Sequence, residues 1–163
     1  MIANAKALGN EKFRADITKR DGYTVVTLRG EIDEDTSFES IKKAGGPYIF
    51  NFRGLASINS CGIRSWVNLL KELGSSQVFY EECPPLVVRQ LNMVPSFLGT
   101  AKVLSVYLPY VCDSTEEEKL VLMDLRDVQN PASQVKTTVP CKECEDGEIE
   151  FDGQPAQYFA FWR

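Results

Sequence analysis

The cysteines carry the most distinctive chemistry of this chain, because its 163 residues include five cysteines and no histidine. Without histidine, the chain cannot form a Ser-His-Asp or Cys-His nucleophile, a histidine base or a histidine-containing metal site. Cys141 and Cys144 have the C-x-x-C spacing with which two thiolates bind one zinc ion, and Cys112 precedes them. Cys112, Cys141 and Cys144 are therefore the candidate metal ligands.

The segments around these cysteines, P-Y-x-C, P-C-x-x-C and G-x-x-x-F-D, resemble a zinc ribbon. A ribbon takes four thiolates from two C-x-x-C knuckles, but the first knuckle here reads Cys112-Asp-Ser-Thr115. Threonine is a poor zinc ligand. We therefore predict a degenerate ribbon with no cofactor and no stoichiometric zinc. The alternative is a zinc-binding or redox module that uses Cys112, Cys141 and Cys144.

A second group of candidate residues, Asn59, Ser60, Cys61 and Gly62, lies where a strand passes into a helix expected to begin at about Cys61. The start of a helix has N–H groups without partners and a partial positive charge, both of which would stabilise a phosphate on Ser60. Gly62 has no side chain to block the approach of a kinase or a binding groove. The alternative is that Ser60 only caps the helix. For Cys61, a reactive thiol and a small buried residue are the two interpretations.

The elements that must position these residues follow from hydrophobic periodicity. A hairpin about Gly22 comes first, and the Thr36-x-x-Glu39 spacing predicts a capping box that opens a helix. Residues 48–52 are nearly all apolar, as expected of a central strand. The remaining expected elements are a helix with Ile63, Trp66, Val67 and Leu70 on one face, strands over 78–80 and 102–107, and a helix opened by Pro84-Pro85.

This β-β-α-β-α-β-α-β order predicts an α/β fold with a mixed sheet. The run Val25–Leu28, the segment Gly30–Asp33 and the loop Ile58–Ile63 resemble a STAS domain, the fold of bacterial anti-sigma factor antagonists and of some transporter tails. The resemblance covers roughly residues 12–107. It implies that Ser60 is phosphorylated by a partner kinase and that phosphorylation breaks the complex. Asn59 stands where the family usually has Asp, which puts this switch in question.

Charge divides the chain at about residue 107. Residues 1–107 hold 13 Lys and Arg against 11 Asp and Glu, whereas residues 108–163 hold 5 against 12. We therefore predict a STAS-like domain over 1–107 and a small β-rich, ribbon-like extension over 108–163. The acidic extension argues against a nucleic acid partner. The aromatic run Tyr158–Trp162 is expected to pack on the first domain.

These features predict a non-enzymatic regulatory protein that acts in partner switching. The chain has no phosphate-binding loop of the form G-x-x-x-x-G-K, and no pair of acidic residues stands out by its spacing as a catalytic pair. By resemblance, the partner is an anti-sigma-type serine kinase or another regulatory protein, bound through the Ser60 loop and the helix that follows. The alternative is an unphosphorylated STAS accessory subunit of a larger assembly. The odd cysteine count, the lack of an apolar signal core and the absence of a span of ~20 apolar residues predict a cytoplasmic protein without a transmembrane segment.

Overall fold

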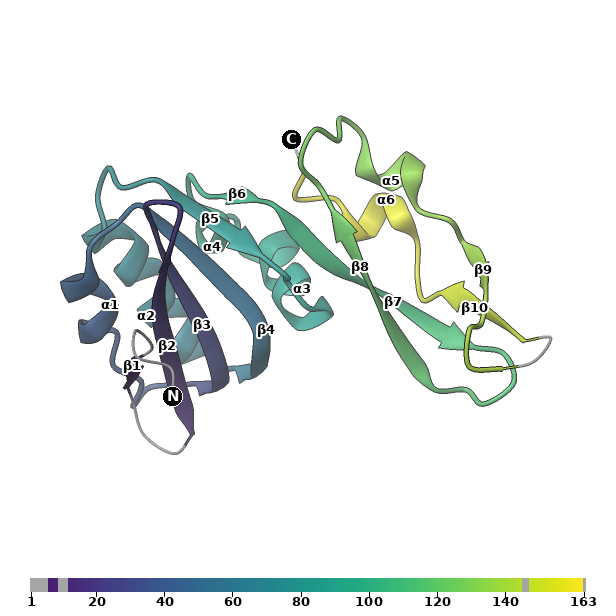
Figure 1. Ribbon diagram of the computed structural model, residues 1–163, viewed down its shortest axis with the longest axis horizontal. Helices are drawn as coiled ribbons and strands as arrows, with labels where there is room; N and C mark the ends of the chain where they lie inside the picture. Colours follow the sequence, from purple (N-terminus) through teal and green to yellow (C-terminus); the bar gives the residue numbers. More distant parts are fainter. Residues whose placement is uncertain (1–5, 9–11, 145–146, 163) are drawn as a thin grey trace.

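The computed structural model describes residues 6–8, 12–144 and 147–162. They form two β-sheets with short and long helices beside them, so the predicted α/β class is confirmed. Figure 1 shows the two sheets side by side along the longest axis of the molecule, with strand β7 leading from the first into the second. Residues 1–5 and 9–11, which belong to the segment expected to lack a signal core, lie outside the described residues.

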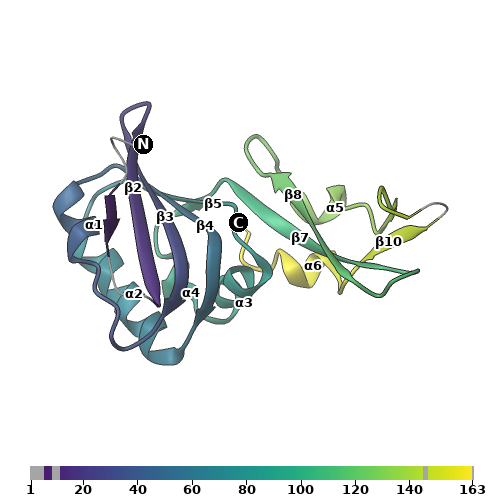
Figure 2. The same cartoon turned by 60° about the horizontal axis from the view of Figure 1, so that its bottom comes forward.

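The first sheet has six strands in the order β1-β2-β3-β4-β5-β6. The pairs β1–β2 and β2–β3 are antiparallel, and the pairs from β3 to β6 are parallel. Helices α1 to α4 lie together on one face of this sheet (Figures 1 and 2). The elements are β1 (Lys6–Leu8), β2 (Phe13–Arg20), β3 (Tyr23–Ile32), α1 (Glu39–Ala44), β4 (Tyr48–Ile58), α2 (Ser60–Glu72), β5 (Val78–Glu81), α3 (Pro85–Met93), α4 (Pro95–Leu98) and β6 (Lys102–Val103).

The core between this sheet and its helices is built around Trp66 of α2, which is fully buried. Its ring lies 4.8 Å from that of Phe50 on the central strand β4, in an edge-to-face arrangement. The indole N–H donates a hydrogen bond to the Tyr80 hydroxyl, which in turn donates to the carbonyl of Phe97. The polar atoms of these large rings are therefore satisfied inside the core, and α2 is held firmly against β4 and β5.

Two local predictions for this half are wrong. Thr36 does not open a capping box, because its hydroxyl accepts a hydrogen bond from the backbone of Asp33, and α1 begins only at Glu39 without a side-chain cap. The strand expected over 102–107 is divided: β6 ends at Val103 in the first sheet, and β7 (Ser105–Cys112) belongs to the second. A turn closed by a local hydrogen bond competed with the capping box in the first case, and pairing with a distant strand decided the second.

The second sheet has four antiparallel strands in the order β8-β7-β10-β9. This part of the chain is β-rich, as expected, and the polar segment after residue 127 contains one short helix. The elements are β7, β8 (Glu118–Asp124), α5 (Pro131–Gln134), β9 (Thr138–Pro140), β10 (Glu148–Phe151) and α6 (Pro155–Tyr158).

The C-terminal segment joins the two halves. Phe159 and Phe161 are buried, and Asn92 of α3 exchanges hydrogen bonds with the backbone of Tyr158 and of Phe161. The expectation that this aromatic run packs on the first half is confirmed at α3. The expected domain boundary after residue 107 falls inside β7, so the division of the chain at that point stays a prediction. None of the helices in the described part of the chain has the length and hydropathy needed to cross a bilayer.

Candidate functional site

The junction between β4 and α2 brings the candidate binding loop to the surface. Strand β4 runs parallel to β3, and its last residue, Ile58, lies beside Ile32. The chain then turns into α2 at Ser60, one residue earlier than expected. A Cβ atom on Gly62 would lie only 2.4 Å from the carbonyl oxygen of Ile32, so glycine is required here for close packing of the helix on β3.

Asn59, and not Ser60, caps this helix. The Asn59 side-chain oxygen accepts a hydrogen bond of 2.7 Å from the Gly62 N–H, and its backbone is extended, as is typical of an N-cap. The amide group of the same side chain donates to the Glu34 carboxylate at 3.0 Å, which lowers the pKa of Glu34. The alternative that Ser60 serves as the cap is therefore wrong.

The four loop residues differ in exposure. Asn59, Ser60 and Cys61 are exposed, whereas Gly62 is buried. Gly62 therefore serves packing on β3 and is not the open approach that we expected. The Ser60 hydroxyl has no hydrogen-bond partner among the residues that the structure describes. The interpretation of Cys61 as a small buried residue is wrong, and its reactivity stays a prediction.

The outer face of α2 continues this exposed surface along the helix. Arg64 and Asn68 are exposed, and a hollow of about 330 Å³ lies between α2 and α1. Its lining is mixed in charge, with Glu39 and Glu72 both bound to Lys42. A polar surface of mixed charge next to the helix start is suited to a protein partner with complementary charges.

The three candidate metal ligands come together in the second sheet. The Cys112 sulfur lies 3.8 Å from that of Cys141 and 3.3 Å from that of Cys144, and all three sulfurs lie within 4.8 Å of one another. Cys112 and Cys141 are buried, and Cys144 is partly exposed. The other two cysteines, Cys61 and Cys83, do not belong to this group. The sequence pattern therefore correctly identified which cysteines could act together.

Thr115 stands where a zinc ribbon would have a cysteine, and in the structure it interacts with Cys112. Hydrogen bonds from its hydroxyl and from its backbone N–H to the Cys112 sulfur lower the pKa of Cys112 to about 6. The hydrogen bonds with Cys112 and Cys141 raise the pKa of Cys144 to about 12. Cys112 and Cys144 thus titrate as an interacting pair, in which Cys112 loses its proton first and Cys144 keeps its own.

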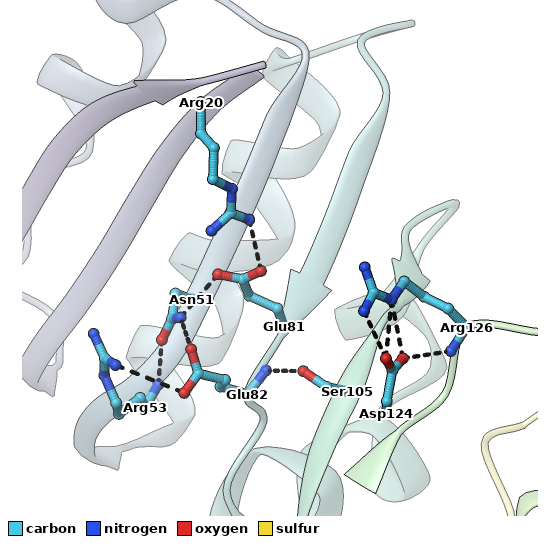
Figure 3. Close-up of polar contacts among 8 residues, drawn as sticks. All are labelled: Arg20, Asn51, Arg53, Glu81, Glu82, Ser105, Asp124 and Arg126. Carbon is cyan, nitrogen blue, oxygen red and sulfur yellow. Dashed lines mark hydrogen bonds and ion pairs between the residues drawn. The ribbon is translucent and has the colours of Figure 1, made fainter. Parts of the chain in front are cut away.

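A polar network on the sheet face away from the helices was not predicted (Figure 3). Its centre is the buried Asn51, whose amide group donates to the carboxylates of both Glu81 and Glu82, while its oxygen accepts from the backbone of Arg53. The signal was present in the sequence, since Asn51 is the one polar residue in the apolar run 48–52. A buried polar side chain in a central strand requires partners.

This network joins the two sheets. Glu82 adopts the left-handed backbone conformation (φ 51°), accepts a hydrogen bond from the Tyr107 hydroxyl and donates its own N–H to Ser105. A hollow of about 430 Å³ beside it is lined on the far side by Asp124 and Arg126, which bind each other. Both carboxylate oxygens of Glu81 and both of Glu82 have a hydrogen-bond partner. The network therefore holds β7 at the edge of the first sheet.

No protein family model matches this chain, and no curated protein matches it.

Proposed function

We propose that this chain is a non-enzymatic, STAS-like regulatory protein that binds a partner protein through the start and outer face of α2, and that phosphorylation at Ser60 releases the partner. The observation that carries the proposal is that the two adjacent residues at the helix start have different roles. Asn59 supplies the cap, so the Ser60 hydroxyl is exposed and not used by the fold. A kinase could therefore modify Ser60 without disturbing α2.

The position of Ser60 also suits a switch. It is the first residue of a 13-residue helix, where negative charge interacts favourably with the helix dipole, by about 0.3–1 kcal/mol. A phosphate there would carry about −1.5 to −2 charges. In the free protein this charge is exposed to water, whereas in a complex it would be removed from water inside the contact surface. Binding would suffer far more than folding.

The partner expected from the STAS resemblance is an anti-sigma-type serine kinase. Its contact surface would have to match the exposed residues beside Ser60, which include Arg64 and Asn68. The mixed-charge hollow between α1 and α2 would widen that surface. The STAS assignment of the first sheet is part of this proposal. It is supported by the mixed sheet and by the layer of helices on one face only.

The test compares binding with stability in two variants at one position. Parent, Ser60→Ala and Ser60→Asp proteins are used to capture partners from native lysate, and the captured proteins are identified by mass spectrometry. The partner is then purified for titration calorimetry. We expect Ser60→Ala to bind as the parent does, and Ser60→Asp to lose at least about tenfold in affinity, which corresponds to about 1.4 kcal/mol.

Ser75→Asp is the matched control, because Ser75 is exposed just beyond the other end of α2. It adds the same charge to the surface and should leave binding unchanged. If Ser60→Asp binds the identified partner as tightly as the parent does, the switch is disproved. Incubation of the parent with the partner and ATP, followed by peptide mass spectrometry, would show phosphate on Ser60 if the partner is the kinase.

A further inference from the structure

Two hairpin turns of the second sheet meet around three sulfur atoms. The turn between β7 and β8 presents Cys112, and the turn between β9 and β10 presents Cys141 and Cys144. In both views the two turns lie at the same end of this sheet (Figures 1 and 2). Nothing in the proposed partner binding at α2 uses this cluster.

The two turns are also fastened to each other directly. The N–H of Asp113 donates to the carbonyl of Glu148, and the Asp113 carboxylate accepts from the N–H of the same residue. Lys119 forms ion pairs with Glu117 of the first turn and Glu143 of the second. The three sulfurs are thus held in position by contacts that do not involve the sulfurs themselves, which is what a preformed ligand set requires.

We propose that Cys112, Cys141 and Cys144 form a zinc site with three thiolate ligands, whose fourth coordination position is filled from outside the cysteines. In a tetrahedral site with Zn–S bonds of ~2.3 Å, the sulfurs are separated by ~3.8 Å. The observed separation of 3.8 Å between the sulfurs of Cys112 and Cys141 equals this value, and that of 3.3 Å between Cys112 and Cys144 is shorter by about 0.5 Å. The third sulfur pair also lies within 4.8 Å.

The chemistry of the ligand set selects the ion. Thiolates bind soft or borderline cations such as Zn²⁺, whereas Mg²⁺ and Ca²⁺ require oxygen ligands. Cys112 and Cys141 are shielded from water, and the partly exposed Cys144 provides access for the ion. Binding replaces the thiol protons by the metal. This argument favours the alternative over our prediction of a ribbon without stoichiometric zinc, which stays untested.

Thr115 determines that the site is open. It is exposed and lies in the turn that follows Cys112, which is closed by a hydrogen bond of 2.8 Å from the Glu116 N–H to the Cys112 carbonyl, and it adds no fourth thiolate. Thr115→Cys would bring a fourth sulfur to the same turn. Thr115→Cys adds a ligand, whereas replacing one of the three cysteines removes one. It therefore tests the arrangement of the metal ligands even if a protein that lacks one of the cysteines fails to fold.

The experiment uses the full chain without a histidine tag, reduced and stripped of metal under nitrogen. Co²⁺ is titrated as a spectroscopic probe, and Zn²⁺ is then added to displace it. We expect a thiolate-to-cobalt charge-transfer band that saturates at one ion per chain and disappears on addition of zinc. In Thr115→Cys the band should grow by about one third, since one thiolate joins three. Its zinc affinity, measured by competition with a chromophoric chelator, should rise at least about tenfold.

Cys141→Ser should lose the band, and Cys61→Ser, the control in helix α2 beside the other sheet, should keep it. A reduced parent protein with no charge-transfer band, or with the same titration as Cys141→Ser, would overturn the site. A Thr115→Cys protein that binds cobalt with an unchanged band would overturn the assigned fourth position. Either failure would leave partner binding at Ser60 unaffected, since Ser60 begins helix α2 beside the first sheet and the three cysteines belong to the second.

Discussion

The side-chain oxygen of Asn59 accepts a hydrogen bond from the backbone N–H of Gly62 at 2.7 Å. This single contact separates two roles that adjacent residues could each have taken. It assigns the structural role to Asn59 and leaves Ser60 exposed without a part in the cap.

The first prediction concerns this division. Asn59→Ala removes the cap and should lower the free energy of unfolding by about 1 kcal/mol, with a range of about 0.5–2 kcal/mol. Ser60→Ala removes no contact and should change it by less than about 0.5 kcal/mol. Urea unfolding followed by circular dichroism measures both. Asn59→Ser is the control, because it keeps a capping oxygen and should lose only a few tenths of a kcal/mol. Equal losses in the two alanine variants would contradict this assignment.

The second prediction concerns the fit of α2 against β3. In Gly62→Ala the added methyl group would lie 2.4 Å from the Ile32 carbonyl oxygen, so the helix must shift. We expect a loss of about 1–3 kcal/mol in the free energy of unfolding, as is typical of an overpacked site. Arg64→Ala is the control, because Arg64 is exposed and lies two residues after Gly62 in the same helix. It should change the free energy of unfolding by less than about 0.5 kcal/mol. A stable Gly62→Ala protein would show that the helix start can move.

The third prediction concerns the C-terminal segment. Truncation after Gly153 removes the buried Phe159 and Phe161 and exposes the surface of α3 that they cover. The loss should reach several kcal/mol, at ~25 cal/mol per Å² of apolar surface. Asn92→Ala, which leaves the Phe161 N–H without its acceptor, should cost about 1–3 kcal/mol. Thermal melts would contradict the docking of this segment if the truncated chain melts within a degree or two of the parent.

The fourth prediction concerns the network that joins the two sheets. Asn51→Ala removes the donor that binds the carboxylates of Glu81 and Glu82 and should cost about 1–3 kcal/mol. Asn51→Asp should cost more, because it replaces the donor by a third carboxylate in a buried place. Urea unfolding at neutral pH distinguishes the two. An Asn51→Asp protein as stable as the parent would disprove the role of this amide.

The order of the elements could be predicted from the sequence because each depends on a local pattern. The apolar positions of α2, among them Trp66, recur at helical spacing, and the alternation in β2 and the apolar run in β4 are equally local. The three cysteines were also recognisable, since C-x-x-C with a distant third cysteine is a pattern in the chain itself. Asn51 could have been recognised by its polar side chain in an apolar strand.

Only the tertiary structure decided which residues meet. The division of the strand over 102–107 depends on which sheet each half pairs with, and β7 finds its partners β8 and β10 further along the chain. The approach of Cys112 to Cys141 and Cys144 depends on two hairpin turns coming together. Periodicity reports which side of an element is apolar, but a distance between two turns is set by the packing of the whole sheet.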